Sequence, residues 1–316
     1  MDQAVRAGLA DSLHSVFDTL GPAPRRDGMI AALLQRIRAG PVAPSLFGCY
    51  FELVLALFDA RDAEAAALVE ELLRPANRAS DSLRIVTLED RDLGPGQSRR
   101  YQRLLRADVG GDIQPLSPER RADAAARLDL ALDLLRLAAP DLWAELSGLV
   151  REIVLARPEE GPRGFTFGGA SSFALWGALV LNAASFGERL DIAVSLAHEA
   201  AHTLLFGLAL GGSLTQNDPA ERYPSPLRQD PRPMEAVAHA TFVTARMIYA
   251  LEALIAAGVL SDGEAMRARE QLAANERACD AGFRTVASGA RFTPAGASTF
   301  EGLRRYMEGR RAPRVP

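Results

Sequence analysis

Cysteine, histidine and lysine are scarce in this chain of 316 residues. It has two cysteines, four histidines and no lysine, so all 36 of its basic side chains are arginine. Codon usage in a GC-rich genome is the preferred explanation for the arginine bias. Cys49 and Cys279 lie far apart in the sequence, unlike the cysteines of a disulfide framework or a thiolate metal site. This pattern predicts a protein of a reducing compartment, the cytoplasm.

Excess positive charge and long apolar runs are absent as well. The arginines face 40 acidic residues, which gives a formal net charge of −4. The chain therefore offers no general electrostatic reason to bind nucleic acid or an anionic membrane. No run of about 18 uncharged apolar residues predicts a membrane span. Residues 1–13 lack the layout of a signal peptide, which also favours a cytoplasmic location.

The composition is that of a globular protein, because hydrophobic residues make up 48% of the chain. We expect a predominantly helical α+β fold, with an N-terminal helical domain over residues 1–115 and a metal-binding domain over residues 116–316. The polar stretch 89–118 is expected to be a domain boundary or a mobile loop. Helices are predicted at 2–20, 28–39, 44–60, 62–74, 118–139, 141–156, 192–208, 234–257, 261–288 and 298–309, and strands at 83–88, 164–167 and 171–186.

The most informative motif is His198-Glu199-Ala200-Ala201-His202, an HExxH sequence in an otherwise apolar stretch. Nothing from residue 192 to 208 breaks a helix, and in a helix the two histidines lie one turn apart on one face. Two imidazoles at this spacing can share a metal ion, with Glu199 beside them to handle protons or orient a water. A structural histidine pair is the alternative. A strand followed by an HExxH helix is the order found in the zincin metalloenzymes, so a zincin-like core is expected, with a small sheet or edge strand beside the helix.

A metal ion held by side chains usually needs at least a third protein ligand. The metzincin pattern HExxHxxGxxH is absent, because Leu205 and Leu208 occupy the positions of its glycine and its third histidine. Glu235 and His239 lie one turn apart on the next predicted helix, and either can complete the site. Arg246 follows His239 by two turns on the same face.

Three segments carry a resemblance to a known family. They are similar to the HExxH-motif peptide-modification proteins found beside ribosomal-peptide (RiPP) gene clusters. The most specific part is the block Arg-Gln-Asp-Pro-Arg-Pro at 228–233, which precedes the helix that carries His239. Together the matching blocks span about residues 165–250. The three segments are residues 168–182, 196–205 and 223–243.

The resemblance implies an enzyme of a family first described as peptidases. Some members are instead iron(II)- and 2-oxoglutarate-dependent oxygenases that hydroxylate a side-chain β-carbon of a ribosomally made precursor peptide. The family pattern implies that His198, His202 and His239 hold the metal. This chain departs from the pattern at Glu235, where no acid is expected, so a carboxylate ligand stays open.

Two functions follow from these residues. In the oxygenase, an arginine binds the far carboxylate of 2-oxoglutarate through paired charged hydrogen bonds, and Glu199 lies near the metal as an acid or water orienter. The alternative is a zinc metallopeptidase of the gluzincin type, with Glu199 as general base and Glu235 as third ligand. A peptide-binding module without catalysis is a third possibility. The candidate carboxylate-binding residues are Arg246, Arg232 and Arg228.

Overall fold

The computed structural model describes residues 1–21, 24–74, 82–159 and 167–311. These residues are predominantly helical and contain one small sheet, which confirms the predicted α+β class. They form two compact units, Met1–Arg127 with Leu146–Phe186 and Leu128–Glu145 with Gly187–Pro316. The units differ from the domains predicted from the sequence, which meet at residues 115 and 116, because residues 146–186 complete the sheet of the first unit.

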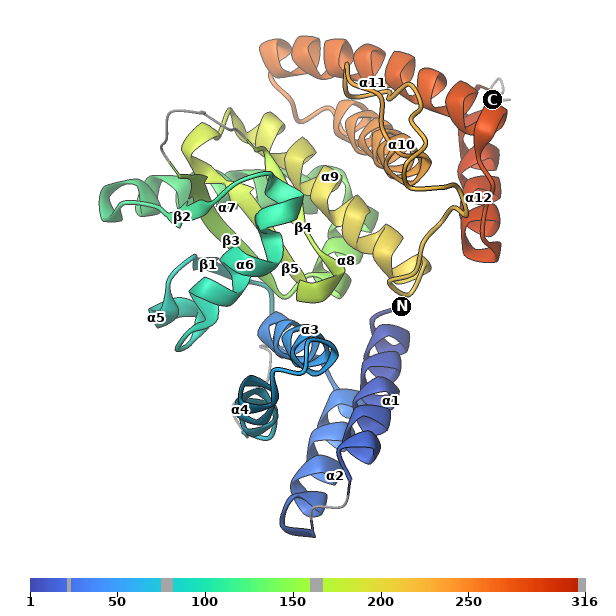
Figure 1. Cartoon of the computed structure of the whole chain (residues 1–316). Helices are drawn as coiled ribbons and strands as arrows, with labels where there is room; N and C mark the ends of the chain where they lie inside the picture. The colour runs from blue at the N-terminus through green and yellow to red at the C-terminus, as the bar shows by residue number, and fades with distance from the viewer. Residues whose placement is uncertain (22–23, 75–81, 160–166, 312–316) are drawn as a thin grey trace. The chain divides into compact units, whose positions relative to one another are not determined.

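The first four predicted helices are confirmed and belong to the first unit. Arg6 on the first of them donates to the backbone oxygen of Ile37 at 2.6 Å and to that of Arg38 at 2.9 Å. These bonds satisfy carbonyl groups that the end of the second helix leaves without a helical partner. The four helices, blue in Figure 1, are α1 (Asp2–Leu20), α2 (Pro24–Ala39), α3 (Pro44–Phe58) and α4 (Asp62–Leu72).

The sheet lies in the same unit and has five strands. Strands β1, β3 and β5 are parallel, whereas β2 and β4 run antiparallel to their neighbours. Every residue of β5 is buried, as are the first five of β3, which is typical of parallel strands covered on both faces. The path runs β1 (Arg84–Thr87), β3 (Glu152–Pro158), β5 (Ala178–Asn182) and β4 (Gly169–Ser171), with β2 (Ile113–Pro115) beside the end of β3.

The strand predicted at 83–88 is confirmed, but the structure corrects two other predictions. The helix predicted over 141–156 ends early: α8 is Pro140–Leu149, and the apolar residues after it form β3. A short apolar run has no periodicity that separates a buried strand from a buried helix. The strand predicted at 171–186 is interrupted, because Gly177 turns the chain with φ 90° just before β5.

The strand predicted at 164–167 falls mostly outside the described residues. Residues 164–166 belong to the part of the chain that the structure leaves undescribed, and Phe167 is not in a strand. Phe167 is buried, and its backbone oxygen accepts a hydrogen bond of 2.9 Å from the side-chain amide of Asn182.

The prediction of a boundary or mobile loop at residues 89–118 is wrong. This stretch contains α5 (Asp90–Leu93), α6 (Gln97–Val109) and β2. The stretch is rich in arginine, yet the Arg100 residue is only 4% exposed to solvent. The guanidinium of Arg100 bonds to Glu52 on α3 at 2.7 Å and to Glu71 on α4 at 2.6 and 2.9 Å. Partners that lie about 30 and 50 residues away therefore turn a polar segment into part of a packed unit.

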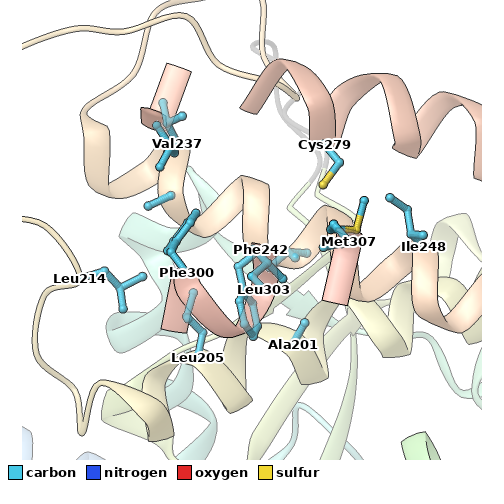
Figure 2. Close-up of a cluster of buried hydrophobic side chains, with 14 of the residues drawn as sticks. Ala201, Leu205, Leu214, Val237, Phe242, Ile248, Cys279, Phe300, Leu303 and Met307 are labelled. Carbon is cyan, nitrogen blue, oxygen red and sulfur yellow. The ribbon is translucent and has the colours of Figure 1, made fainter. Parts of the chain in front are cut away.

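The second unit is built mainly from four helices whose predicted positions are confirmed. Helix α10 packs against α9, α11 and α12. Figure 2 shows the shared core, in which Leu205 of α9, Phe242 of α10 and Leu303 of α12 point toward one another. The four helices are α9 (Arg189–Leu208), α10 (Met234–Ala256), α11 (Asp262–Gly289) and α12 (Pro294–Arg311), coloured yellow to red in Figure 1. Helix α7 (Pro118–Ala138) spans the division between the units.

Helices α10 and α11 touch closely at a glycine. A Cβ atom built on Gly282 would lie 2.3 Å from Oγ1 of Thr241, a fully buried residue of α10. Gly282→Ala is therefore expected to force the two helices apart and to lower stability by about 1–3 kcal/mol, as overpacking does. Thermal unfolding followed by circular dichroism measures the change.

A matched control for this prediction lies on the same helix. A Cβ atom on Gly263 would meet no atom within 4 Å, so Gly263→Ala is expected to leave stability unchanged or raise it by up to about 1 kcal/mol. Equal melting temperatures for the two variants would contradict close packing at Gly282.

Candidate metal centre

Helix α9, which carries the HExxH motif, is held firmly at its start. Asp191 accepts the backbone N–H of Glu188 at 3.1 Å. Arg189 donates to both carboxylate oxygens of Glu264 at 2.7 and 2.9 Å. Glu264 also closes a capping box with Ser261 at the start of α11. The motif therefore lies on a helix whose position along α11 is set by charged and capping contacts.

The residues in and just after the motif lie on two faces of α9. Ala201 and Leu205 belong to the hydrophobic core shown in Figure 2. His198 and His202 follow one another at the i, i+4 spacing of a common face, and their ring centroids are 5.0 Å apart. The predicted helical pairing of the two imidazoles is therefore present in the structure.

His239 of α10 joins this pair. Its ring centroid lies 6.0 Å from that of His202, and Phe206 packs 5.8 Å from the His239 ring and 6.3 Å from the His202 ring. Three of the four histidines of the chain thus form one cluster, hereafter the histidine cluster, made of His198, His202 and His239.

Burial keeps two members of the histidine cluster uncharged. It lowers the pKa of His198 to about 4. Burial, together with the nearby charges that His198 and His239 can carry, lowers the pKa of His202 well below its usual range. Both rings are therefore neutral at pH 7 and have a lone pair available for a metal ion.

The metal-free protein is expected to lose stability as the pH falls from about 6.5 toward 4. In this window the unfolded chain takes up protons at His198 and His202 that the folded state does not, so acid favours unfolding. Each histidine contributes a slope of at most about 1.4 kcal/mol per pH unit, and less where water screens the partly exposed His198 ring.

Urea unfolding at pH 7.5 and pH 5 measures this dependence. His198→Gln is expected to flatten it, whereas His14→Gln, at a side chain that is 60% exposed, serves as the control. Curves of equal steepness for wild type and His198→Gln would contradict the prediction.

Glu235, the alternative third ligand, accepts hydrogen bonds from the loop after α9. Its carboxylate accepts the backbone N–H groups of Leu214 and Thr215, both at 2.9 Å, and the Thr215 hydroxyl at 2.7 Å. Oε1 also lies 3.2 Å from Nε2 of His239. Burial alone raises the pKa of Glu235, but the hydrogen bonds from His239, Leu214 and Thr215 outweigh it and bring the pKa to about 2. Both oxygens therefore anchor the loop after α9 and orient His239, an arrangement common beside metal-binding histidines.

Glu235→Ala is expected to loosen both the loop and His239. It leaves buried backbone N–H groups without acceptors, which costs about 1–3 kcal/mol each. Loss of a carboxylate that orients a ligand histidine lowers metal affinity by about 10–100-fold. Thermal unfolding and metal titration measure the two effects, with Glu270→Ala, at an exposed residue of α11, as control. Unchanged metal affinity would show that Glu235 does not act on a ligand.

Glu199 and a methionine flank His198. Glu199 is 4% exposed, and its Oε1 lies 3.9 Å from Nε2 of His198. On the other side of the ring, Nδ1 lies 3.3 Å from the sulfur of Met247. With Nδ1–H directed at the thioether, the neutral ring keeps its lone pair on Nε2, on the Glu199 side. Sequence reasoning missed Met247, although its position eight residues after His239 places it near the same face of α10.

The three candidate arginines lie in different environments. Arg228 is exposed, and Arg232 is 41% exposed and pairs with Asp230 at 2.9 Å. Arg246 lines a cavity of about 570 Å³ between α9, α10 and α12, on the same helix as His239. Of the three, Arg246 is the one that the cavity places next to space for a ligand.

The donor set of the histidine cluster fits a single metal ion closely but not fully. Two imidazoles on one metal, with N–metal bonds of about 2.0–2.1 Å, have ring centroids about 4.5–5.5 Å apart. The spacing of 5.0 Å between His198 and His202 lies in this range, and the 6.0 Å between His202 and His239 exceeds it. Among the described residues no group of three His, Cys, Asp or Glu side chains already has metal-binding geometry. For His239 to share a metal ion with His202, its ring would have to turn or move closer.

No family model matches this chain, and no curated protein matches it. In the part of the chain that the structure describes, no helix is long and apolar enough to cross a membrane. The function is therefore inferred from the histidine cluster and its surroundings.

Proposed function

We propose that this protein is an iron(II)- and 2-oxoglutarate-dependent oxygenase that hydroxylates a side-chain β-carbon of a ribosomally made precursor peptide. The observation that carries the proposal is the histidine cluster. The hydrogen bonds of Glu235 with Leu214 and Thr215 support His239, rather than Glu235, as the third ligand. Imidazole ligands suit iron as well as zinc. The peptide substrate rests on the sequence resemblance of residues 168–182, 196–205 and 223–243.

Each residue of the site has a role in this proposal. His198, His202 and His239 hold the metal and leave its other positions open. Iron, when bound with 2-oxoglutarate and O₂, supplies the oxidising power for hydroxylation, and the protein supplies binding and orientation. Glu235 fixes the His239 ring, and the buried Glu199 carboxylate orients a water or holds a proton near His198. Leu204, Leu208 and Phe242 line the cavity that Arg246 shares, where they would pack against the hydrocarbon part of a bound ligand.

A zincin-like core and a cytoplasmic location also belong to the proposal. The order of β5 followed by α9 along the chain supports the first. Cys49 and Cys279 are both buried thiols, which fits a reducing compartment.

The test is a turnover assay with the purified protein, iron(II), ascorbate, 2-oxoglutarate and the precursor peptide encoded beside its gene. We expect the peptide mass to rise by about 16 Da, one oxygen atom, with one succinate released per hydroxylation. His239→Ala is expected to stop both, while Glu270→Ala, on the exposed face of α11, is the control. A wild-type protein that releases no succinate would overturn the proposal.

One observation favours the alternative, a zinc metallopeptidase. Glu199 lies beside His198, with Oε1 3.9 Å from Nε2, where a general base acts on a metal-bound water. That function predicts peptide cleavage with zinc, no dependence on 2-oxoglutarate, and loss of cleavage in Glu199→Gln. Its third ligand, Glu235, would first have to release Leu214 and Thr215. A protein that binds the peptide but neither hydroxylates nor cleaves it would be a binding module.

A further inference from the structure

The cavity beside Arg246 is lined by side chains of the second unit alone. Its volume of about 570 Å³ lies within the range of about 300–1,000 Å³ that is usual for small-molecule sites. Its lining combines apolar side chains of α9, α10 and α12 with Arg246 and four residues that carry hydroxyl groups. The hydroxyl-bearing residues are Tyr249, Ser298, Thr299 and Tyr306. The hydroxyls of Tyr249 and Tyr306 lie 3.5 Å from Asp141 and 3.4 Å from Glu252, respectively. An arginine in a mostly apolar lining suits a small carboxylate with a hydrocarbon body.

Arg246 already holds a carboxylate of the protein itself. Its Nη2 lies 2.6 Å from Oε1 of Glu145, at the end of the α8 segment that belongs to the second unit. The guanidinium carbon also lies 5.3 Å from the centre of the Tyr249 ring. Nε of Arg246 is buried and has no hydrogen-bond partner. Glu145 therefore uses one edge of a guanidinium whose planar fork can bind a carboxylate through two bonds.

The ion pair of Glu145 and Arg246 has a desolvation cost, because both side chains are largely buried. Burial raises the pKa of Glu145, and the attraction and hydrogen bond of Arg246 lower it by less. The side chains are 24% and 21% exposed, so neither charge is fully hydrated. A carboxylate that makes two bonds to the fork and accepts hydroxyl groups as well can replace such a partner.

We propose that Glu145 is an internal competitor for Arg246, which it releases when a small dicarboxylate enters the cavity between α9, α10 and α12. The inference deepens the proposed function, on which it rests for the identity of the ligand as 2-oxoglutarate. Glu145 then sets the affinity of the site. If Glu145 is paired with Arg246 in about nine-tenths of the molecules, it lowers the apparent affinity for the dicarboxylate about tenfold, because the ligand binds only when Arg246 is released.

The test measures binding of glutarate to the full-length, metal-free protein by isothermal titration calorimetry. Glutarate has both carboxylates of 2-oxoglutarate but no oxo group with which to chelate a metal, so its binding does not require iron. Glu145→Gln is expected to bind glutarate about ten times more tightly than wild type. Glu145→Ala, a second variant, is expected to change affinity in the same direction. The double variant Glu145→Gln/Arg246→Gln is expected to lose binding.

Asp141→Asn is the matched control. The substitution removes a negative charge from the same helix, at a residue whose carboxylate lies 3.5 Å from the Tyr249 hydroxyl. We expect it to change affinity less than about twofold, as loss of a screened charge does.

Each outcome decides the inference. Unchanged affinity in the two Glu145 variants, or an equal gain in Asp141→Asn, would show that Glu145 does not compete for Arg246. Absence of glutarate binding in every folded protein would show that the cavity is not a carboxylate site. If the expected affinities are found while the turnover assay yields no succinate, the proposed oxygenase fails and the competitor role of Glu145 stands.

Discussion

His202→Ala is expected to abolish metal binding and, with it, turnover. His202 is the central member of the histidine cluster, since its ring lies 5.0 Å from His198 and 6.0 Å from His239. Removing it leaves two imidazoles on different helices with a gap between them. The loss of affinity should exceed the 10–100-fold that follows removal of an outer-shell partner of a metal ligand.

Metal titration followed by succinate measurement checks this prediction. Removing the metal from wild type with a chelator should stop turnover, and iron(II) should restore it where zinc does not. His14→Ala controls for loss of a histidine as such, because His14 lies on α1 in the first unit with its side chain 60% exposed. One metal ion bound per chain with unchanged affinity in His202→Ala would identify the histidine cluster as a structural feature of the core.

Glu52→Ala is expected to destabilise the first unit by about 3–5 kcal/mol. Glu52 is 8% exposed and bonds to Arg100 at 2.7 Å and to Arg103 at 3.0 Å. Without it, the buried guanidinium of Arg100 keeps Glu71 but loses the partner at its Nε edge. An unpaired charge in this position has a large desolvation cost. In the intact ion pair, the attraction between the two charges roughly balances that cost.

Urea unfolding measures the effect, and Glu64→Ala is the matched control. Glu64 forms an ion pair with Arg61 on the surface, where both side chains are more than 40% exposed, so its loss should cost less than about 1 kcal/mol. The double variant Glu52→Leu/Arg100→Met should recover part of the stability, because it also removes the buried charge of Arg100 and leaves only Glu71, which is 26% exposed, without that partner. Similar losses in Glu52→Ala and Glu64→Ala would contradict a buried network.

The sequence correctly predicted features that depend on neighbours within four or five residues. The HExxH helix and the shared face of His198 and His202 are both local. It also placed His239 on a helix of its own, but not its distance from His202. The histidine cluster, as a set of three rings, required the packing of α10 on α9.

Errors arose where a distant partner decides the structure. The segment at 152–158 is a strand because β1 and β5 pair with it on either side, and its own residues fit a helix as well. Residues 89–118 have the composition of a solvated linker. Arg100 is nevertheless buried, because it bonds to Glu52 and Glu71. In both cases the partners lie too far away in the sequence for a local pattern to reveal them.

The sequence by itself determined most of the helices and the pair of histidines on α9, because hydrogen bonds and side-chain spacing along one helix are set by nearby residues. Only the tertiary structure decided the partners of the charged groups at the site. Glu235 is engaged by Leu214 and Thr215, and Arg246 by Glu145, which lies 101 residues away in the chain. A buried charge takes the partner that folding brings within hydrogen-bond distance, and sequence spacing holds no record of that choice.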